Sequence, residues 1–593
     1  MPAKLLIANR GEIAVRIQRA AAELGMRTVS VFSQDDADSL HRRVAGESRA
    51  LDKSGAAAYL DIDAILQVAR DTRCDAIHPG YGFLSENAKF ARRCGEAGLT
   101  FVGPRPELLA LFGDKAEARA TAERLGVPVL SGTSKPANLS EAIDFFDALP
   151  AAGAMIIKAV GGGGGRGMRV VRRREELDDA YTRCQSEARA AFGNGDVYVE
   201  QLLPRARHVE VQIVGDGSGA VSHLGERDCS IQRRHQKLIE IAPAPGLPEG
   251  LRQRLVTAAT SLAASVRYDN IGTFEFLVDT DSSSPNSSFA FIEANPRLQV
   301  EHTVTEEVYG VDLVAIQLEL AGGRSLADLG LHQIDVPAPR GVAIQARVNM
   351  ETMQPDGATR PSSGTLSAFA PACGPGIRVD TFGYAGYTPS GRFDALLAKV
   401  IAYHPSGRFE YAVSRLQRAL GEFHVDGVAV NIPFLERLLR HPAFRSGAFH
   451  TRFIDDHIAE LVVPGDPAPF TPKAPANSTP SVPLPQPAAA SEPAPPPPSP
   501  EAPEPEPTLP PPRQIDTPPG TVPVASPLQG TIVSVEVREG TSIRTGQLLV
   551  VVESMKMEHE IHADVEGVVR RIAVNEGGVI NAGEAMLFVE APE

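Results

Sequence analysis

The 593-residue sequence has only five cysteines, and no two of them show Cys-x-x-Cys spacing. They are Cys74, Cys94, Cys184, Cys229 and Cys373. An odd, scattered set of this kind argues against a disulfide framework and against a cysteine-based zinc site.

Long apolar runs and an excess of basic residues are also missing. No apolar run approaches the roughly 18 residues of a membrane span, although 43% of the residues are hydrophobic. The N-terminal MPAKLLIANRGEIAVRI has charges inside its apolar segment, unlike a secretory signal. A net charge of −15 argues against nucleic acid as a partner. We therefore expect a soluble, cytoplasmic protein that binds neither membranes nor nucleic acid.

A chain of this length should form several domains, because single cores stop growing near roughly 250 to 300 residues. The range 456–523 is rich in proline and has too little apolar content to fold, as in SEPAPPPPSPEAPEPEPTLPPP. Polyproline chain extends by about 3.1 Å per residue, so this linker could reach on the order of 150 Å. It is interpreted as a flexible tether, with a passive spacer as the alternative.

The last part of the chain, 524–593, contains two half-repeats that are 37 positions apart (567 − 530). Gly530 matches Gly567, and apolar residues alternate at period two in both halves. This pattern is typical of short antiparallel strands with one buried face, and it predicts a small all-β sandwich. The SMKMEHE segment lies between the halves and places Lys556 at the tip of a hairpin.

Residues 1 to about 455 alternate apolar strands with helical stretches, which predicts an α/β region. The alternation begins with the strand-like KLLIAN, continues with the helical RGEIAVRIQRAAAELG, whose apolar residues are spaced by three and four, and then reaches the strand-like RTVSVFS. Its most informative loop lies in MIIKAVGGGGGRGMRVV, where glycines 161–165 let backbone amides approach a polyphosphate. Lys158 and Arg166 add positive charge. A strand-like segment follows the loop, which favours a strand–loop–strand phosphate flap over a Rossmann turn. The chain has no Gly-Lys pair, so a Walker A loop is excluded.

A second polar cluster is predicted in FIEANPRLQVEHTVTE. If this segment is extended, its polar residues at alternate positions point to one face. These residues are Glu293, Asn295, Arg297, Gln299 and Glu301. Together with Glu275 from GTFEFLVD, they supply the hard oxygen ligands that Mg²⁺ prefers beside nucleotide phosphates.

These segments, with HPGYGFLSEN, FGDKAEAR, RHVEVQIVGD and GERDCSIQRRHQKLIE, resemble the biotin carboxylase branch of the ATP-grasp enzymes. The C-terminal Met-Lys-Met turn is similar to that of biotinyl carrier domains. The resemblance implies α/β and α+β folds in a three-part carboxylase, followed by a disordered linker and the all-β carrier. The expected domains are 1–114 (N-terminal α/β), 115–330 (ATP-grasp), 331–455 (C-terminal), 456–523 (linker) and 524–593 (carrier).

The resemblance also implies a set of site residues. ATP would be held by Lys115, Lys158, Gly163, Gly164, Gly165, Glu200, Gln201, Leu203, His208, Gln232, His235, Glu275 and Glu293. Mg²⁺ or Mn²⁺ would bind Glu275, Glu293 and Asn295. Bicarbonate would bind Lys237, Arg297, Gln299 and Val300. Biotin, attached to Lys556, would meet Arg347 and Tyr81. The catalytic residues would be Glu301 as the base, with Arg297, Arg347 and Lys237.

The implied function is ATP-dependent carboxylation of carrier-bound biotin, the first half-reaction of an acetyl- or propionyl-CoA carboxylase of fatty acid metabolism. No carboxyltransferase domain fits between residue 455 and the carrier, so a separate carboxyltransferase (beta) subunit is expected. Biotin protein ligase is the other expected partner, and a dimer of the carboxylase regions is expected.

Two other functions stay open at this point. One is a different ATP-grasp ligase with a lipoyl-like carrier, and the other is a non-catalytic scaffold that carries biotin. The sequence also departs from the family at Ala294, Gln201, Arg392 and Ala395. Cys229 has no assigned base, so we expect it to have a packing role rather than to act as a nucleophile.

Overall fold

The computed structural model describes residues 2–133, 135–149, 153–160, 167–192, 194–203, 205–279, 288–462, 520–528, 530–554, 557–580 and 583–590. The chain divides into two compact units, 1–470 and 471–593, here called the large unit and the small unit. Gly163, Gly164, Gly165, Lys556 and most of the predicted linker lie outside the described residues. Among the helices described, none is both long and apolar enough to cross a membrane.

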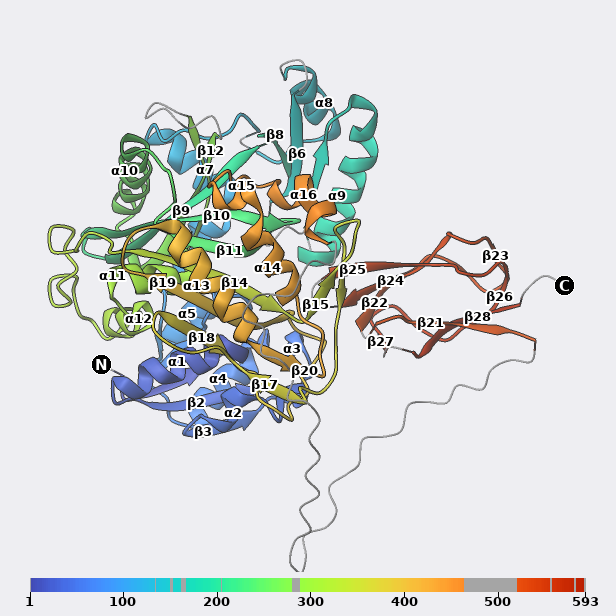
Figure 1. The fold of residues 1–593 in the computed structure, drawn as a ribbon, viewed down its shortest axis with the longest axis horizontal. Coiled ribbons are helices and arrows are strands. Elements are labelled where there is room, and N and C mark those ends of the chain that lie inside the picture. Colours follow the sequence, from blue (N-terminus) through green and yellow to red (C-terminus); the bar gives the residue numbers. More distant parts are fainter. Residues whose placement is uncertain are drawn as a thin grey trace, which may run out of the picture. The chain divides into compact units, whose positions relative to one another are not determined.

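The large unit begins with a parallel five-stranded sheet of order β3-β2-β1-β4-β5 (Figure 1). Its strands are β1 (Lys4–Ile7), β2 (Arg27–Phe32), β3 (Glu47–Ala50), β4 (Ala76–His78) and β5 (Thr100–Phe101). The helices here are α1 (Gly11–Glu23), α2 (Leu40–Arg43), α3 (Ala56–Tyr59), α4 (Ile62–Asp71), α5 (Ala88–Glu96), α6 (Pro106–Gly113) and 3₁₀ helix η1 (Gln34–Asp36). The strands and helix predicted in the first 33 residues are confirmed. The apolar residues Ile13, Ile17 and Ala20, three and four apart, pack α1 into the same core as β1, and most other residues of α1 are buried as well.

A small antiparallel sheet of order β7-β6-β8 carries the glycine-rich segment. Its strands are β6 (Ala154–Ala159), β7 (Met168–Val171) and β8 (Val197–Leu202). The helices in this part are α7 (Lys115–Arg124), α8 (Leu139–Asp147), α9 (Leu177–Phe192) and 3₁₀ helix η2 (Arg174–Glu176). Because β6 pairs with β7 in antiparallel register, the predicted strand–loop–strand arrangement is confirmed for the residues on both sides of the loop.

The centre of the large unit is an antiparallel eight-stranded sheet of order β13-β12-β9-β10-β11-β14-β19-β18. The strands are β9 (Ala206–Asp216), β10 (Val221–Arg233), β11 (Gln236–Ala242), β12 (Asp269–Asp279), β13 (Phe289–Asn295), β14 (Val342–Asn349), β18 (Ile377–Thr381) and β19 (Leu396–His404). The remaining strands are β15 (Glu351–Met353), β16 (Thr359–Pro361), β17 (Ala368–Ala370) and β20 (His424–Asp426).

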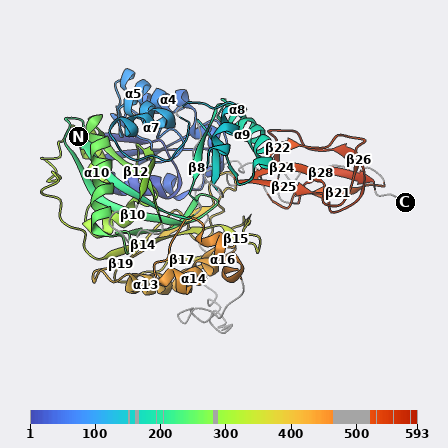
Figure 2. The same cartoon turned by 90° about the horizontal axis from the view of Figure 1, so that it is seen from above.

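Helices cover this sheet (Figures 1 and 2). They are α10 (Glu249–Ser265), α11 (His302–Tyr309), α12 (Leu313–Ala321), α13 (Phe409–Glu422), α14 (Ile432–Arg440), α15 (Pro442–Arg445) and α16 (Phe453–Leu461). On β14, Ile344 and Val348 join the apolar core formed with α13 and α14. The alternate residue Gln345 donates instead to Glu240 and accepts from Thr303 of α11. Strand alternation therefore points apolar residues to α13 and α14, and polar ones to the other face.

The small unit is a sandwich of two four-stranded antiparallel sheets, β21-β28-β26-β23 and β25-β24-β22-β27, as predicted. The strands are β21 (Val522–Ala525), β22 (Gly530–Val535), β23 (Ser542–Ile543), β24 (Leu548–Ser554), β25 (Met557–His562), β26 (Gly567–Ile572), β27 (Val579–Ile580) and β28 (Ala585–Glu590). Each sheet contains strands from both half-repeats. A Cβ on Gly530 would lie 2.3 Å from the Glu553 carbonyl oxygen, and one on Gly567 would lie 2.1 Å from that of Glu590. The repeated glycines therefore mark equivalent close approaches of two backbones.

Two details differ from the expectations. The polar run that begins at Glu293 is a strand only to Asn295, where β13 ends. Pro296 follows and has no N–H for a sheet hydrogen bond, so Arg297 to Glu301 lie in a loop that leads into α11. In addition, α16 extends to Leu461, so residues 456–461 of the expected linker range are helical.

Candidate active site

Polar side chains gather on one face of the eight-stranded sheet and in the loop after β13. Glu301, at the N-cap of α11, is only 1% exposed. Its Oε1 lies 2.7 Å from Lys237 Nζ, and its Oε2 lies 3.0 Å from Arg347 Nη2. Burial alone would raise the pKa of Glu301, but the charges of Lys237, Arg347 and Arg227 hold it well below its usual range. The predicted base is therefore an ionised carboxylate between two of the predicted catalytic cations.

Glu275 is the second centre of the site. Its Oε1 accepts from Asn295 Nδ2 at 2.6 Å and from Gln299 Nε2 at 2.9 Å, and it lies 3.5 Å from Lys237 Nζ. Its Oε2 lies 2.6 Å from His208 Nε2. Glu275 thus connects residues predicted to hold the nucleotide and its metal with residues predicted to hold bicarbonate.

The predicted metal ligands lie together. Glu275 and Glu293 are opposite one another on β12 and β13. Asn295 Nδ2 lies between them, 2.6 Å from Glu275 Oε1 and 3.3 Å from Glu293 Oε1. Burial opposes ionisation of Glu293, but Lys115, 3.2 Å away, lowers its pKa. Glu275 and Glu293 supply two ionised carboxylates. Asn295 would add its side-chain oxygen if its amide group rotated by a half-turn. Together these oxygen atoms are suited to a hard cation such as Mg²⁺.

Several of the residues predicted to bind ATP lie on β6 and β8. Glu200 is buried, and its carboxylate pairs with Lys158 at 2.5 Å and with Arg119 at 3.0 Å. Gln201 lies on β8 and Leu203 lies just after it, and both are half-buried. Lys158 is near the end of β6, directly before the glycine-rich segment. Its amino group is held by the Glu200 carboxylate.

The loop after β13 holds the predicted bicarbonate residues through its own contacts. Arg297 Nη1 donates to Gln299 Oε1 at 2.9 Å, and its Nε lies 3.1 Å from Glu86. The carbonyl of Val300 accepts from Lys399 Nζ at 3.1 Å. These contacts fix the loop conformation that brings Glu301 into the site.

Arg347 on β14 is oriented by Glu240 of the neighbouring strand β11. Its Nε donates to Glu240 Oε1 at 2.6 Å, while Nη2 reaches Glu301. Tyr81, the other predicted biotin contact, donates its hydroxyl proton to Glu12. Glu12 Oε2 lies 3.1 Å from the wholly buried Lys399, which also bonds to Val300. Tyr81 is therefore connected to the Glu301 loop through Glu12 and Lys399.

Two predicted nucleotide residues lie where β10 meets β11. Gln232 is buried and stands opposite Lys237 in the register of the two strands. His235 is exposed in the turn between them, with a positive φ of 66°. The structure shows no direct contact of either with the Glu275 carboxylate.

Cys229 is buried with its Sγ 3.9 Å from Glu301 Oε1. Burial raises the pKa of its thiol well above the ordinary value, which keeps it protonated and unreactive. This fits the packing role predicted from the sequence.

The sequence interpretation missed several residues of the site. Glu210 binds Lys237 at 2.7 Å and the wholly buried Arg227 at 2.6 Å. Glu240 and Lys399 orient Arg347 and Val300. Glu210 could have been found, because His208, Glu210 and Gln212 alternate with Val209 and Val211 on one strand.

The departures from the family pattern are accommodated. Ala294 is 4% exposed and packs in the core beneath β13 with Phe274 and Phe291. Arg392 lies 3.4 Å from Asp35. Neither is in contact with Glu301.

Comparison with known families matches four consecutive parts of the chain. Residues 1–109 match "Biotin carboxylase, N-terminal domain", and residues 114–329 match "Carbamoyl-phosphate synthase L chain, ATP binding domain". Residues 345–456 match "Biotin carboxylase C-terminal domain", and residues 522–589 match "Biotin-requiring enzyme".

Among curated proteins, the mitochondrial pyruvate carboxylase of Rattus norvegicus is 49% identical over 461 residues. This alignment covers 77% of the chain but only 38% of that protein, so the chain spans about two fifths of the length of the curated relatives it matches.

Two solved structures are similar. The biotin carboxylase domain dimer of Hydrogenobacter thermophilus 2-oxoglutarate carboxylase, in complex with MgADP, ADP and bicarbonate, is 38% identical with a TM-score of 0.74. That match covers 79% of this chain and all of the other. A single-chain, multi-domain long-chain acyl-CoA carboxylase is 40% identical with a TM-score of 0.68, covering 100% of this chain and 51% of that one.

Proposed function

The chain belongs to the biotin-dependent carboxylases, with a biotin carboxylase region fused to a biotinyl carrier domain, and we propose that it carboxylates its own carrier-bound biotin using ATP and bicarbonate. Family, fold class and cofactor class are as predicted from the sequence. The observation that carries the proposed reaction is the buried Glu301 carboxylate between Lys237 and Arg347.

The site solves an electrostatic problem. Attack of bicarbonate on the γ-phosphate brings two anions together, so cations must offset their repulsion. Lys115 and Lys158, with a divalent ion held by Glu275, Glu293 and Asn295, would offset the charge of the phosphates.

Arg297, Lys237 and Gln299 would hold bicarbonate. In the structure, Lys237 is paired with Glu210 and Glu301, which keeps the pKa of Glu301 low. A bound anion beside Lys237 would share that charge and raise the pKa of Glu301, because a second negative charge disfavours ionisation. Glu301 would thus become a better proton acceptor when its substrate is present.

Biotin, when present on Lys556, supplies a ureido nitrogen that accepts the carboxyl group. On the protein side, Arg347 is set in place by Glu240 and directs its guanidinium beside Glu301. It would stabilise negative charge on the ureido oxygen. The same pairing orients Arg347 before any substrate binds, which is the preorganisation that such electrostatic catalysis needs.

For the second half-reaction we propose an acyl-CoA of the acetyl or propionyl type as acceptor and a separate carboxyltransferase subunit. The extent of the matches supports the acyl-CoA class of acceptor, and the separate subunit is carried over from the expectation drawn from the sequence. The pyruvate carboxylase match covers 77% of the chain, whereas the long-chain acyl-CoA carboxylase match covers all of it, carrier included. Biotin protein ligase as the modifying enzyme, a dimer of carboxylase regions and a cytoplasmic location belong to the same proposal; the Hydrogenobacter domain crystallised as a dimer.

The test measures bicarbonate-dependent ADP release by the biotinylated chain, followed by transfer of labelled carboxyl groups. Loss of the ATP cleavage in Glu301→Gln and Lys237→Ala is expected, and a chain with no bicarbonate-dependent ATP cleavage would contradict the proposed reaction. Mass spectrometry of the Lys556 peptide separates biotin from lipoate.

Partner and acceptor need a separate experiment. Capture through biotin should copurify a carboxyltransferase that uses acyl-CoA. Transfer to pyruvate by the captured assembly, or acyl-CoA carboxylation by the purified chain alone, would contradict the proposed acceptor or the proposed subunit division.

A further inference from the structure

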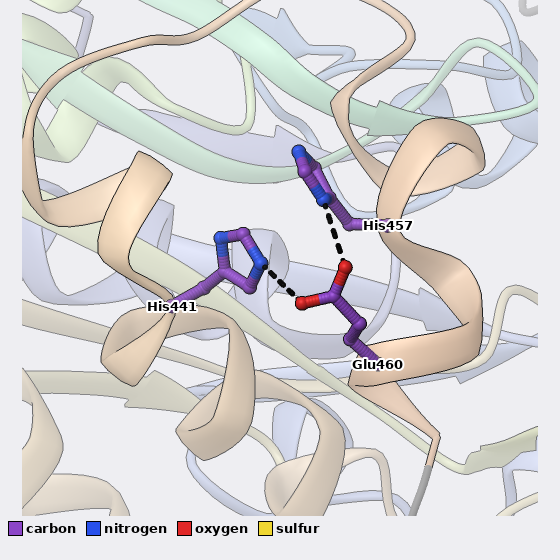
Figure 3. A group of neighbouring side chains, drawn as sticks. All are labelled: His441, His457 and Glu460. Carbon is purple, nitrogen blue, oxygen red and sulfur yellow. Dashed lines mark hydrogen bonds and ion pairs between the residues drawn. The ribbon is translucent and has the colours of Figure 1, made fainter.

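A second cluster of ligand-type side chains lies at the C-terminal end of the large unit. It consists of His441, which precedes α15, and of His457 and Glu460 on α16. Residues three apart on a helix are neighbours on its surface, so His457 and Glu460 present one face. Figure 3 shows the three side chains turned toward one another. None of them belongs to the site proposed above.

The separations are those of ligands around one metal ion. His441 Nε2 lies 3.2 Å from Glu460 Oε2, and His457 Nδ1 lies 3.6 Å from Glu460 Oε1. One ligand atom from each residue can be chosen so that all three lie within 4.8 Å of one another. Tetrahedral zinc with bonds of about 2.0 to 2.1 Å separates its ligand atoms by about 3.3 Å. Small side-chain adjustments would therefore bring all three onto one ion.

If the three residues formed only ion pairs, one ring nitrogen of His457 would lack a partner. Its Nδ1 is buried and has no hydrogen-bond partner, and 3.6 Å is too long for a hydrogen bond to Glu460. Buried polar atoms are seldom left in this state. A cation between the three residues would satisfy His457 Nδ1, His441 Nε2 and the carboxylate together.

The surroundings fix the two imidazoles and leave a way in. The ring of the buried Phe453 lies 4.9 Å from the His457 ring and 5.5 Å from the His441 ring, between centroids. The side chain of His441 is 10% exposed, whereas that of Glu460 is 68% exposed. An ion can reach the rings from the carboxylate side, where water can complete its coordination.

We propose that His441, His457 and Glu460 bind a divalent transition metal ion, with Zn²⁺ the best match. Two imidazoles and one carboxylate suit zinc, whereas Mg²⁺ takes oxygen ligands and near-octahedral geometry. The ion ties α16 to the connection between α14 and α15. In sequence, α16 is the last described element of the large unit before the proline-rich segment. The metal ion would therefore stabilise the helix from which that segment continues.

The direct test titrates Zn²⁺ into the full chain after chelator treatment, with excess Mg²⁺ and no nucleotide present, so that Mg²⁺ occupies the carboxylates of the proposed active site. Competition with a chromophoric chelator gives affinity and stoichiometry, and Co²⁺ reports geometry by its visible absorption. One tight site per chain is expected, with affinity at least about tenfold weaker in His457→Asn and in Glu460→Gln.

The matched control is His424→Asn. His424 is also a surface histidine paired with a carboxylate, Asp426 at 2.9 Å, but it has no second histidine beside it. It should bind Zn²⁺ as the unaltered chain does. Equal Zn²⁺ affinity in the unaltered chain and in Glu460→Gln, an exposed substitution that preserves folding, would overturn the proposal.

A second readout is independent of affinity. An ion that binds only the folded chain raises its unfolding temperature. Zn²⁺ should raise that temperature in the unaltered chain and slow hydrogen exchange in α16, with both effects lost in His457→Asn. Protection of α16 that is unchanged by Zn²⁺ would show that no ion ties this helix down.

Discussion

The two units bury different kinds of residue. The large unit places charges inside: Arg227 and Lys399 are wholly buried, Arg227 pairs with Glu210, and Lys399 pairs with Glu12. The small unit, among its described residues, has Ser526 as its one buried polar side chain, and its core is otherwise apolar. The large unit thus ties its chemistry to its folding, because removing one buried charge leaves its partner unpaired. The described core of the small unit is apolar, so its folding does not depend on pairing buried charges.

The largest expected effect comes from Lys556→Arg. Arginine keeps the charge but cannot form the predicted amide with biotin, so carrier carboxylation should be lost completely. Streptavidin blotting and mass spectrometry report the modification. Bicarbonate-dependent ATP cleavage with free biotin should persist, because every other proposed site residue lies in the large unit. Loss of that cleavage as well would contradict the separation of roles.

Glu301→Gln should lower bicarbonate-dependent ATP cleavage by about 10²- to 10⁴-fold, the usual contribution of a general base. It also leaves Lys237 and Arg347 without a shared counter-charge. Steady-state ADP release measures the effect, and nucleotide binding checks that the site is still formed. Glu319→Gln, which makes the same change at the surface beside Arg324, serves as the control.

Gly567→Ala should destabilise the small unit by about 1–3 kcal/mol, the usual cost of overpacking. The added Cβ would lie 2.1 Å from a backbone carbonyl oxygen. Calorimetry of the full chain should show a lower transition temperature for the small unit and an unchanged one for the large unit. Val533→Thr, at a partly exposed position of the same sandwich, is the control. A shift in both units would mean that they unfold together.

The smallest expected effect is a difference in acid sensitivity. The pKa values of Glu301 and Glu275 are lower in the folded chain, since neighbouring cations outweigh burial. Their contribution to stability is therefore present above the unfolded value near pH 4.3 and is lost as pH falls toward the folded values. The large unit should lose unfolding free energy below about pH 5, more steeply than the small unit. Equal slopes in pH-dependent calorimetry would contradict this.

The sequence predicted best what local patterns determine. Period-two alternation and the matched Gly530 and Gly567 were enough for the sandwich, and helical spacing was enough for α1. Glu275, Glu293 and Asn295 could be grouped because they lie on adjacent strands with alternating side chains.

The contacts that could not be predicted from the sequence depend on strand register. Glu240 orients Arg347 from 107 positions away, and Lys399 reaches Val300 from 99 positions away. Such pairings depend on which strands become neighbours in the eight-stranded sheet. Pro296 carried a local signal for the end of β13, but alternation of the surrounding polar residues concealed it.

Each sheet of the small unit combines strands from both half-repeats, and this arrangement has a consequence for how the halves depend on one another. The first half-repeat alone would supply only the outer strands of one sheet, β21 and β23, and the inner strands of the other, β22 and β24, so it could complete both sheets only by intertwining with a second copy of itself. The sandwich therefore has the strand arrangement that such a homodimer would have if its two chains were joined end to end. Cleavage at the joining hairpin should leave two fragments that reassemble into the same structure.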